Sequence, residues 1–223
     1  MASDIEPPDH GDTESRSSIL VWDVPTRVFH WLLVLCFVLA YVTSESERWQ
    51  LWHVTAGYVF GFLLLFRVCW GLIGTRYARF SDFVRGPKKV VTYLGTLLTR
   101  QPAHYVGHNP AGAWAIISVL VLGLMTVLTG WASFNDYGDW IGELHEVIVN
   151  LLLLVIVVHV AGVIVSSFLH RENLVRAMVN GRKQGSPTDA IRYPQWIIGM
   201  LLIAGIMFFL WGLLTGHMPW LLP

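Results

Sequence analysis

The stretch LHEVIVNLLLLVIVVHV, Leu144 to Val160, places two histidines 14 residues apart in an otherwise almost wholly aliphatic run. Stripping an imidazole of water costs free energy unless something binds the ring, so a histidine inside an apolar run indicates a functional site. Fourteen residues of α-helix advance about 21 Å and turn about 3.9 times, which leaves both rings on nearly the same face. One ligand cannot contact both rings.

The composition of the whole chain is that of an integral membrane protein. Of its 223 residues 54% are hydrophobic and 13% are charged, with a mean hydropathy of +0.54. Soluble domains carry about 25% charged residues. The two cysteines, Cys36 and Cys69, fall inside apolar runs, and the sequence has no CxxCH or CxxC motif. We interpret both cysteines as packing residues rather than as haem-attachment or zinc-binding residues.

Five apolar runs predict five membrane-spanning helices, because each approaches the roughly 20 residues that a helix needs to cross about 30 Å of hydrocarbon. The runs are Val28–Thr43, Trp52–Ile73, Ala113–Phe134, Ile141–Val165 and Trp196–Leu214. The predicted fold is therefore an all-α integral membrane protein. Four of the five transmembrane helices are expected within the first 185 residues, and the fifth is C-terminal.

The basic residues of the connectors predict the orientation, since Lys and Arg are retained on the cytoplasmic side. Two connectors, 75–112 and 166–193, carry six and five basic residues, whereas the other two carry only Arg48 against Glu45, Glu47, Asp136 and Asp139. We expect a cytoplasmic N-terminus and, after five crossings, an external C-terminus.

Three regions are expected along the chain. Residues 1–18 are acidic and polar and predict a disordered cytoplasmic tail. Residues 19–185 form the four-helix domain, in which the stretch near 87–99 predicts a short amphipathic helix on the inner membrane surface. A polar loop with chance periodicity is the alternative for that stretch. Residues 186–223 hold the fifth helix and the external C-terminus.

Four of the nine histidines lie within or at the ends of predicted spans: His30, His53, His145 and His159. With the orientation above, His53 and His145 are both shallow on the outer side, while His30 and His159 both lie toward the cytoplasmic side. The four histidines therefore form two pairs at two depths. Two imidazole pairs from facing helices are what two b-type haems require, with one ring on each side of each iron.

Other interpretations of these histidines fit the sequence less well. A lone membrane histidine is usually an interhelical hydrogen-bonding residue, but chance does not readily pair four of them by depth. A single zinc site would need ligands that converge on one point, which the separation of about 21 Å forbids. A proton relay would need ionisable residues at successive depths, and none lies between Glu146 and His159.

Four segments resemble the bacterial cytochrome b561 family, which includes the b-type membrane subunits of nickel-iron hydrogenases. They are VWDVPTRVFHW around His30, GHNPAGAW before the third span, LHEVIVNLLLLVIVVHVAGV in the fourth span and HRENLVRAMVNGRK after it. The resemblance covers roughly residues 20–185. It implies a bacterial inner-membrane protein in which a four-helix transmembrane bundle holds two noncovalent b haems, with the fifth helix outside the bundle. The implied axial ligands are His30, His53, His145 and His159, and the external C-terminus is then periplasmic.

Further polar residues are candidates for the surroundings of the haems. Arg67 repeats the phase of His53 at the inner depth, and could bind a haem propionate or a quinone carbonyl or reach the inner headgroups. Arg27, one turn before His30, is a candidate for a second propionate contact or for an interfacial anchor. Glu146 and Asn150 could orient a ligand, carry quinone protons or bond between helices. We expect His108 and Asn109 to cap the third helix.

The resemblance implies a protein that moves electrons between membrane quinone and a periplasmic partner, either a c-type cytochrome or a hydrogenase-like subunit. Membrane lipid and quinone are the other expected partners, and no nucleic acid is expected. Whether the chain is itself an enzyme, with quinone oxidoreductase activity, stays open. The alternatives are a non-catalytic membrane anchor of a redox complex and a transporter of metal or haem.

Overall fold

Five helices in the computed structural model, which describes residues 17–98 and 105–217, are long and apolar enough to cross a membrane. They are α1 (Val24–Thr43), α2 (Gln50–Ile73), α5 (Pro110–Phe134), α6 (Asp139–His170) and α8 (Trp196–Leu214). Each helix begins and ends within a few residues of a predicted apolar run. The chain is thus an all-α, multi-pass membrane protein, as the sequence predicts.

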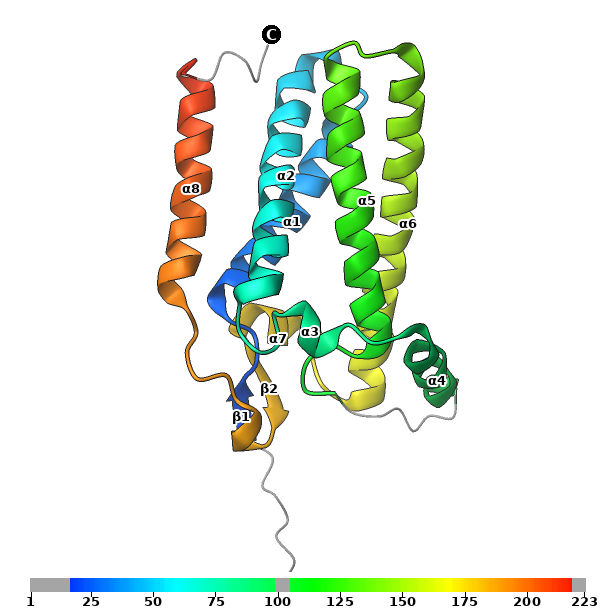
Figure 1. Ribbon diagram of the computed structural model, residues 1–223, viewed down its shortest axis with the longest axis vertical. Helices are drawn as coiled ribbons and strands as arrows, with labels where there is room; N and C mark the ends of the chain where they lie inside the picture. Colours follow the sequence, from blue (N-terminus) through cyan, green and yellow to red (C-terminus); the bar gives the residue numbers. More distant parts are fainter. Residues whose placement is uncertain (1–16, 99–104, 218–223) are drawn as a thin grey trace, which may run out of the picture.

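The shorter elements lie at the two ends of this bundle (Figure 1). One end, the lower one in Figure 1, carries the long connectors and is called the connector end here; the other is the short-loop end. At the connector end lie β1 (Ser17–Leu20), α3 (Phe80–Phe83), α4 (Pro87–Leu98), α7 (Leu174–Asn180), β2 (Arg182–Gly185) and η2 (Pro187–Asp189). The 3-10 turn η1 (Glu47–Trp49) leads directly into α2.

Two of the long helices begin with the same N-terminal motif, a capping side chain followed by proline. Asp23 accepts a hydrogen bond from the backbone N of Thr26 at 2.7 Å, and Asn109 accepts one from Gly112 N at 2.7 Å. Proline is favoured at the first helical position because its missing N–H would have no partner there. The predicted cap at Asn109 is confirmed. The predicted capping role of His108 is wrong, because its ring is instead packed among aromatic side chains.

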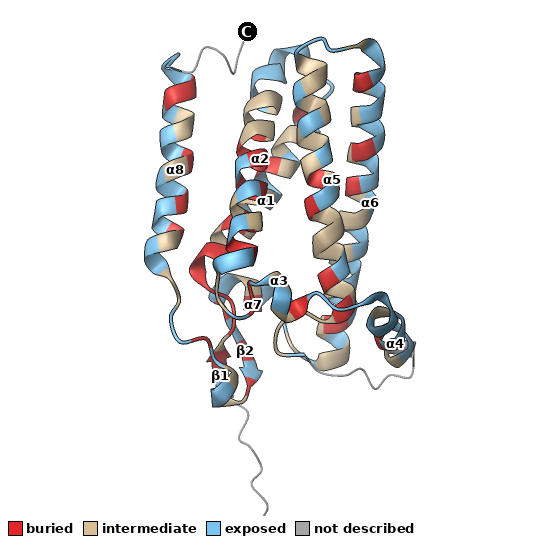
Figure 2. Ribbon diagram, in the orientation of Figure 1, coloured by how far each residue is buried: buried red, intermediate tan, exposed pale blue. Residues whose placement is uncertain are grey.

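The helices pack in two pairs, α1 with α2 and α5 with α6, which are joined by contacts between α2 and α5; α8 packs along α1. Close approach of α2 and α5 depends on small residues, since a Cβ at Gly61 would lie 2.9 Å from Val127 Cγ1. The buried core of the bundle comes from all five long helices: Phe29, Cys36, Val59, Phe60, Leu63, Leu64, Leu120, Leu152, Leu202 and Ile206. Figure 2 shows a second concentration of buried residues at the start of α1, where residues 21–26 are all buried.

Strands β1 and β2 pair antiparallel, with Ser17 opposite Gly185 and Leu20 opposite Arg182. The sequence does not predict this pair, because four-residue strands about 165 positions apart carry no periodicity of their own. Ser17 and Ser18 therefore belong to a strand rather than to the predicted tail, and residues 1–16 of that tail lie outside the described residues. The division of the chain into regions 1–18, 19–185 and 186–223 stays a prediction.

Helix α4 forms where the sequence predicts an amphipathic helix. Tyr93 is buried, at 3% exposure, whereas Val91 and Leu94 are 71% and 47% exposed. The helix contacts α5 at the connector end of the bundle (Figure 1). Its exposed apolar side chains are compatible with the predicted place on a membrane surface, which stays a prediction.

Candidate functional site

At the short-loop end the structure brings together His53, in the first turn of α2, and His145, in the second turn of α6. Their ring centroids lie 6.4 Å apart with an interplanar angle of 81°. The two histidines are 92 residues apart in the chain, and the pairing of α2 and α6 by depth predicts their proximity. We call them the outer pair, after the predicted orientation.

In both residues the same ring nitrogen, Nδ1, is hydrogen-bonded to a backbone carbonyl group. His53 Nδ1 lies 2.8 Å from the carbonyl oxygen of Ala40, and His145 Nδ1 lies 3.0 Å from that of Thr126. A carbonyl oxygen only accepts, so each Nδ1 carries the hydrogen and donates it. In a neutral imidazole this leaves Nε2 with a free lone pair, the state in which histidine binds a metal.

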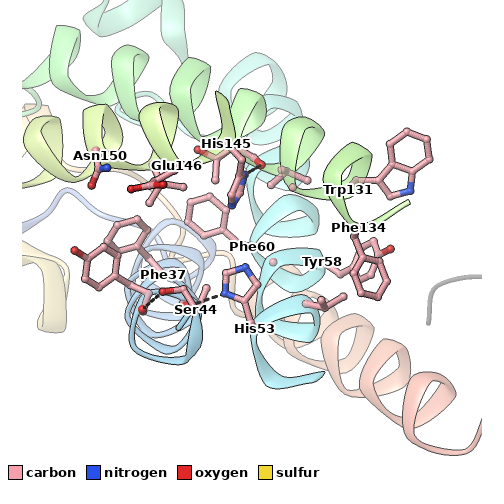
Figure 3. Close-up of a pocket in the computed structure, with 18 of the residues that line it drawn as sticks. Phe37, Ser44, His53, Tyr58, Phe60, Trp131, Phe134, His145, Glu146 and Asn150 are labelled. Carbon is pink, nitrogen blue, oxygen red and sulfur yellow. Dashed lines mark hydrogen bonds between the residues drawn. The ribbon is translucent and has the colours of Figure 1, made fainter. Parts of the chain in front are cut away.

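A cavity of about 480 Å³ lies beside this pair, between α1, α2, α5 and α6 (Figure 3). Volumes of roughly 300–1,000 Å³ are typical of sites that enclose a cofactor. The lining is mainly aromatic and aliphatic, with Phe37, Phe60 and Val149 among its residues. Glu146 and Asn150, predicted as polar candidates, also line it. The site thus combines apolar walls with a few polar groups.

Two glycines shape the cavity. A Cβ at Gly57, one turn after His53, would meet no atom within 4 Å, so this position borders open space in the cavity. A Cβ at Gly130 would lie 2.9 Å from Cε1 of His145 and 3.3 Å from its Nδ1. Gly130 therefore lets the His145 ring lie directly against the backbone of α5. The sequence does not predict the role of Gly130, because the contact joins two different helices.

The outer pair fits a metal ion held between two imidazoles. Two metal–nitrogen bonds of about 2 Å, each followed by roughly 1 Å from nitrogen to ring centre, place such centroids about 6 Å apart. The observed separation is 6.4 Å. The open position at Gly57 and the free Nε2 atoms are also what a flat macrocycle between the rings requires. The residues at the short-loop end therefore fit a haem.

The other two predicted histidines, His30 on α1 and His159 on α6, form the inner pair, and they interact electrostatically. The His30 ring meets the neighbouring Trp31 ring edge-on, with centroids 5.1 Å apart. Its Nδ1 is buried and has no hydrogen-bond partner among the described residues. The structure therefore brings this pair into one region, as predicted by depth.

His108 joins this inner region, which the sequence does not predict. Its ring centroid lies 4.5 Å from that of Trp22 and 4.5 Å from that of Phe83. Burial lowers the pKa of His108 to about 3, and the charge of Arg67 contributes to this shift; smaller contributions come from Lys183, His159 and His30. His108 is therefore neutral at physiological pH.

Arg67 is almost fully buried, at 2% exposure, although it lies in the span of α2. Its guanidinium is 4.8 Å from the ring centroid of Phe80, 5.6 Å from that of Phe29 and 5.7 Å from that of Phe83. Nη1 is buried without a hydrogen-bond partner among the described residues. Such burial disfavours the alternative in which Arg67 reaches out to lipid headgroups, and it leaves a donor available to a ligand.

Arg27 has protein partners instead. Its Nη1 donates to the carbonyl oxygen of Val179 at 2.7 Å, at the end of α7. This contact ties the start of α1 to α7 and gives Arg27 a structural role. A contact of Arg27 with a cofactor stays a prediction.

Asp23 is the polar residue that sequence reasoning missed most clearly. It is 1% exposed, and besides capping α1 it accepts hydrogen bonds from Trp70 Nε1 at 3.1 Å and from Thr75 Oγ1 at 2.5 Å. These bonds tie the start of α1, which carries His30, to the end of α2, which carries Arg67. The Asp-Val-Pro sequence is a capping signal, and it could have identified Asp23 as the start of the helix.

Comparison with known proteins agrees with this geometry. Residues 21–181 match the family model described as prokaryotic cytochrome b561. The chain belongs to the prokaryotic cytochrome b561 family. The four histidines and Arg67 all fall within the part that matches the cytochrome b561 model.

Curated relatives of this cytochrome b561 chain are similar at low identity. A protein of Escherichia coli K12 named as a probable Ni/Fe-hydrogenase 1 B-type cytochrome subunit is 27% identical over 147 residues, which cover 54% of this chain and 62% of the relative. Probable Ni/Fe-hydrogenase B-type cytochrome subunits of Rhizobium leguminosarum bv. viciae and Cupriavidus necator are 24% and 26% identical. Those matches cover 78% of this chain and 92% and 91% of the relatives. The chain thus spans less than two thirds of the Escherichia coli relative, and no solved structure matches it significantly.

Proposed function

We propose that this chain is a dihaem b-type cytochrome that transfers electrons across the bacterial inner membrane, between the quinone pool and a periplasmic redox partner. The observation that carries the proposal is the outer pair, His53 and His145, with Nδ1 of both rings bonded to carbonyl oxygens and Nε2 left free beside a cavity. Membership of the cytochrome b561 family supports it independently.

In this proposal His53 and His145 hold the outer haem, and His30 and His159 hold the inner one. With both imidazoles of a pair bound to the iron, the haem would supply one-electron chemistry and would leave no position for oxygen or substrate. The protein's part is to orient the rings and exclude water. The carbonyl groups of Ala40 and Thr126 hold the outer rings, and aromatic residues such as Phe37 and Phe60 keep the site dry.

The spacing on α6 supports a path across the membrane. His145 and His159 are separated by 14 residues of one continuous helix, about 21 Å along its axis. The two haem sites are therefore at different depths, and aliphatic residues occupy the helix between them. We orient the connector end, with the N-terminus, toward the cytoplasm because it carries the basic connectors. The C-terminus is then periplasmic.

The names of the relatives suggest the partner. All are probable subunits of nickel-iron hydrogenases, so we propose a hydrogenase-like subunit as the periplasmic partner, with a c-type cytochrome as the alternative. The short-loop end carries acidic side chains that would attract a basic patch on such a partner: Glu45, Glu47, Asp136, Asp139 and Glu143. Quinone is the proposed membrane-soluble substrate.

Haem content and reduction by quinol test the proposal together. We expect purified protein to contain close to two noncovalent haems per chain by pyridine haemochrome, and quinol to reduce them. A folded protein that carries no haem would overturn the proposal and favour a membrane anchor. Haem that is bound but lost to an acceptor protein, without reduction by quinol, would favour a haem transporter.

A further inference from the structure

Three buried nitrogen atoms without a partner gather around the inner pair. Six buried side-chain N or O atoms in the described part of the chain lack a hydrogen-bond partner, and three of them are His30 Nδ1, Arg67 Nη1 and His108 Nδ1. Buried polar atoms are nearly always hydrogen-bonded, so orphaned atoms gathered in one region indicate a missing ligand. Because Arg67 can only donate, that ligand presents an acceptor.

Arg67 and His108 face one region. Both side chains lie against the ring of Phe83, the guanidinium at 5.7 Å and the imidazole at 4.5 Å from its centroid. Arg67 and His108 also interact electrostatically, and so do His108 and both histidines of the inner pair. The two orphaned nitrogens are thus placed beside the site proposed for the inner haem.

The charge of Arg67 decides the kind of acceptor. A guanidinium stays protonated in proteins, and a buried charge needs a counter-charge to offset its lost hydration. Asp23 interacts with Arg67 electrostatically, but its two carboxylate oxygens accept from Thr26, Trp70 and Thr75. A neutral carbonyl would leave the charge of Arg67 unmatched, whereas a carboxylate would neutralise it.

We propose that Arg67 and His108 together bind a propionate carboxylate of the inner haem, Arg67 as a charged donor and His108 as a neutral one. This rests on the proposed function. Arg67 then sets the position of the macrocycle between His30 and His159, and its positive charge raises the reduction potential of the inner haem relative to a neutral side chain at the same place.

Reconstitution with haem and with its dimethyl ester tests the proposed contact of Arg67 and His108 with a propionate, because the ester has no carboxylate charge. The experiment uses the full chain with His145→Ala, which leaves only the inner site, after extraction of bound haem in detergent. With Arg67 and His108 intact we expect haem to bind roughly 10- to 100-fold more tightly than the ester, as a charged hydrogen bond implies. Arg67→Gln should bring this ratio close to one, and His108→Leu should reduce it in part.

Arg85→Gln is the matched control, since Arg85 is exposed at the same end of the bundle and its guanidinium donates to the nearby carbonyl oxygen of Asp82. It should leave the ratio unchanged. An unchanged ratio in Arg67→Gln, or equal affinities before any change at Arg67, would overturn the inference. If Arg67→Gln fails to fold, Arg67→Lys keeps the charge and should retain a ratio well above one.

The outcome also separates this inference from the proposed function. Absence of haem binding in every variant contradicts the function itself. Two haems per chain in the unsubstituted protein, with no discrimination against the ester in the His145→Ala protein, would contradict only the carboxylate site. If Arg67→Gln instead weakens binding of a quinone analogue while the ester ratio stays constant, Arg67 belongs to a quinone site and the propionate assignment is wrong.

Discussion

The imidazole rings of His53 and His145 lie 6.4 Å apart and nearly perpendicular, each held by a backbone carbonyl through Nδ1. The carbonyl groups come from helices that carry neither histidine, Ala40 on α1 and Thr126 on α5. All four helices of the bundle therefore contribute to the geometry of this one pair. These carbonyl groups fix the orientation of both rings, as hydrogen-bonded partners commonly do for a metal-binding histidine.

Single histidine substitutions should remove one haem of two. We expect His53→Ala and His145→Ala to lose the same haem, because each leaves its partner as a lone ligand, and His30→Ala and His159→Ala to lose the other. The measurement is haem per chain together with the low-temperature absorption spectrum of the remaining haem. Identical residual spectra for His145→Ala and His159→Ala would show that the assignment by depth is wrong.

Gly57→Ala tests whether the open space beside Gly57 holds a cofactor rather than protein side chains. A methyl group at this position meets no protein atom within 4 Å, so we expect thermal unfolding of the haem-free protein to change little. The same methyl group would enter the cavity beside His53, so we expect occupancy of the outer haem to fall at least several-fold in a haem titration. Gly162→Ala on α6 is the control, since it is also open but does not line the cavity. Equal haem binding by both variants would contradict this use of the cavity.

Gly130→Ala should disturb the outer pair from the side of α5, at the ring of His145. The new Cβ would lie 2.9 Å from His145 Cε1, so the ring or α5 must move. A shift of the ring weakens the bond from Nδ1 to Thr126, and we expect a weaker and spectrally broadened outer haem with the inner haem unchanged. Electron paramagnetic resonance of the two low-spin haem signals measures this. Altered signals from both haems would show that the substitution disturbs the bundle rather than one ring.

Much of the architecture follows from the sequence because hydrocarbon imposes simple rules. Five apolar runs correspond to five long helices, and the 14-residue spacing together with the charge bias of the connectors is enough to pair His53 with His145. These features depend on length, periodicity and composition, which are local properties. Predicting the Asn109 cap requires only the residue type and the proline that follows it.

The features that the sequence does not predict depend on contacts between distant segments. Asp23, Trp70 and Thr75 form one hydrogen-bonded group across two helix ends, and His108 enters the inner region from a connector. The strand pair β1–β2 likewise exists only because two short segments meet. None of these contacts between distant segments produces a periodic pattern in the sequence. The local sequence around His108 therefore predicts a helix cap, whereas in the structure the ring is buried beside the inner pair.

Asp23→Asn should destabilise the join between α1 and α2. The carboxylate accepts three hydrogen bonds while almost fully buried, and an amide would present a donor to one of those donors. Leaving a buried donor such as Trp70 Nε1 without an acceptor costs about 1–3 kcal/mol, so the free energy of unfolding should fall by that amount. Denaturant titration in detergent measures it. Thr75→Val removes only one of the three bonds and should cost less; an equal or larger loss would contradict the central role of Asp23.

Glu172 and Lys183 form a buried ion pair at the connector end, with Oε2 and Nζ 3.4 Å apart and side-chain exposures of 13% and 5%. Glu172 Oε1 also accepts from the backbone N of Gln184, so the pair fixes β2 to the end of α6. Glu172→Gln would leave the Lys183 ammonium buried without its counter-charge, and should lower the free energy of unfolding by about 3 kcal/mol at neutral pH.

The pH dependence of the stability of Glu172→Gln distinguishes an effect of charge from an effect of packing. Burial lowers the pKa of Lys183 from its ordinary value of 10.5, and Glu172 opposes that shift. Loss of the carboxylate lowers the pKa of Lys183 further, so the penalty is complete well below the folded pKa and declines as the pH rises toward 10.5. Lys183→Met in the Glu172→Gln background removes the unpaired charge and should recover most of the lost stability. A penalty that is independent of pH, or that persists in the double variant, would show that the pair acts through packing rather than charge.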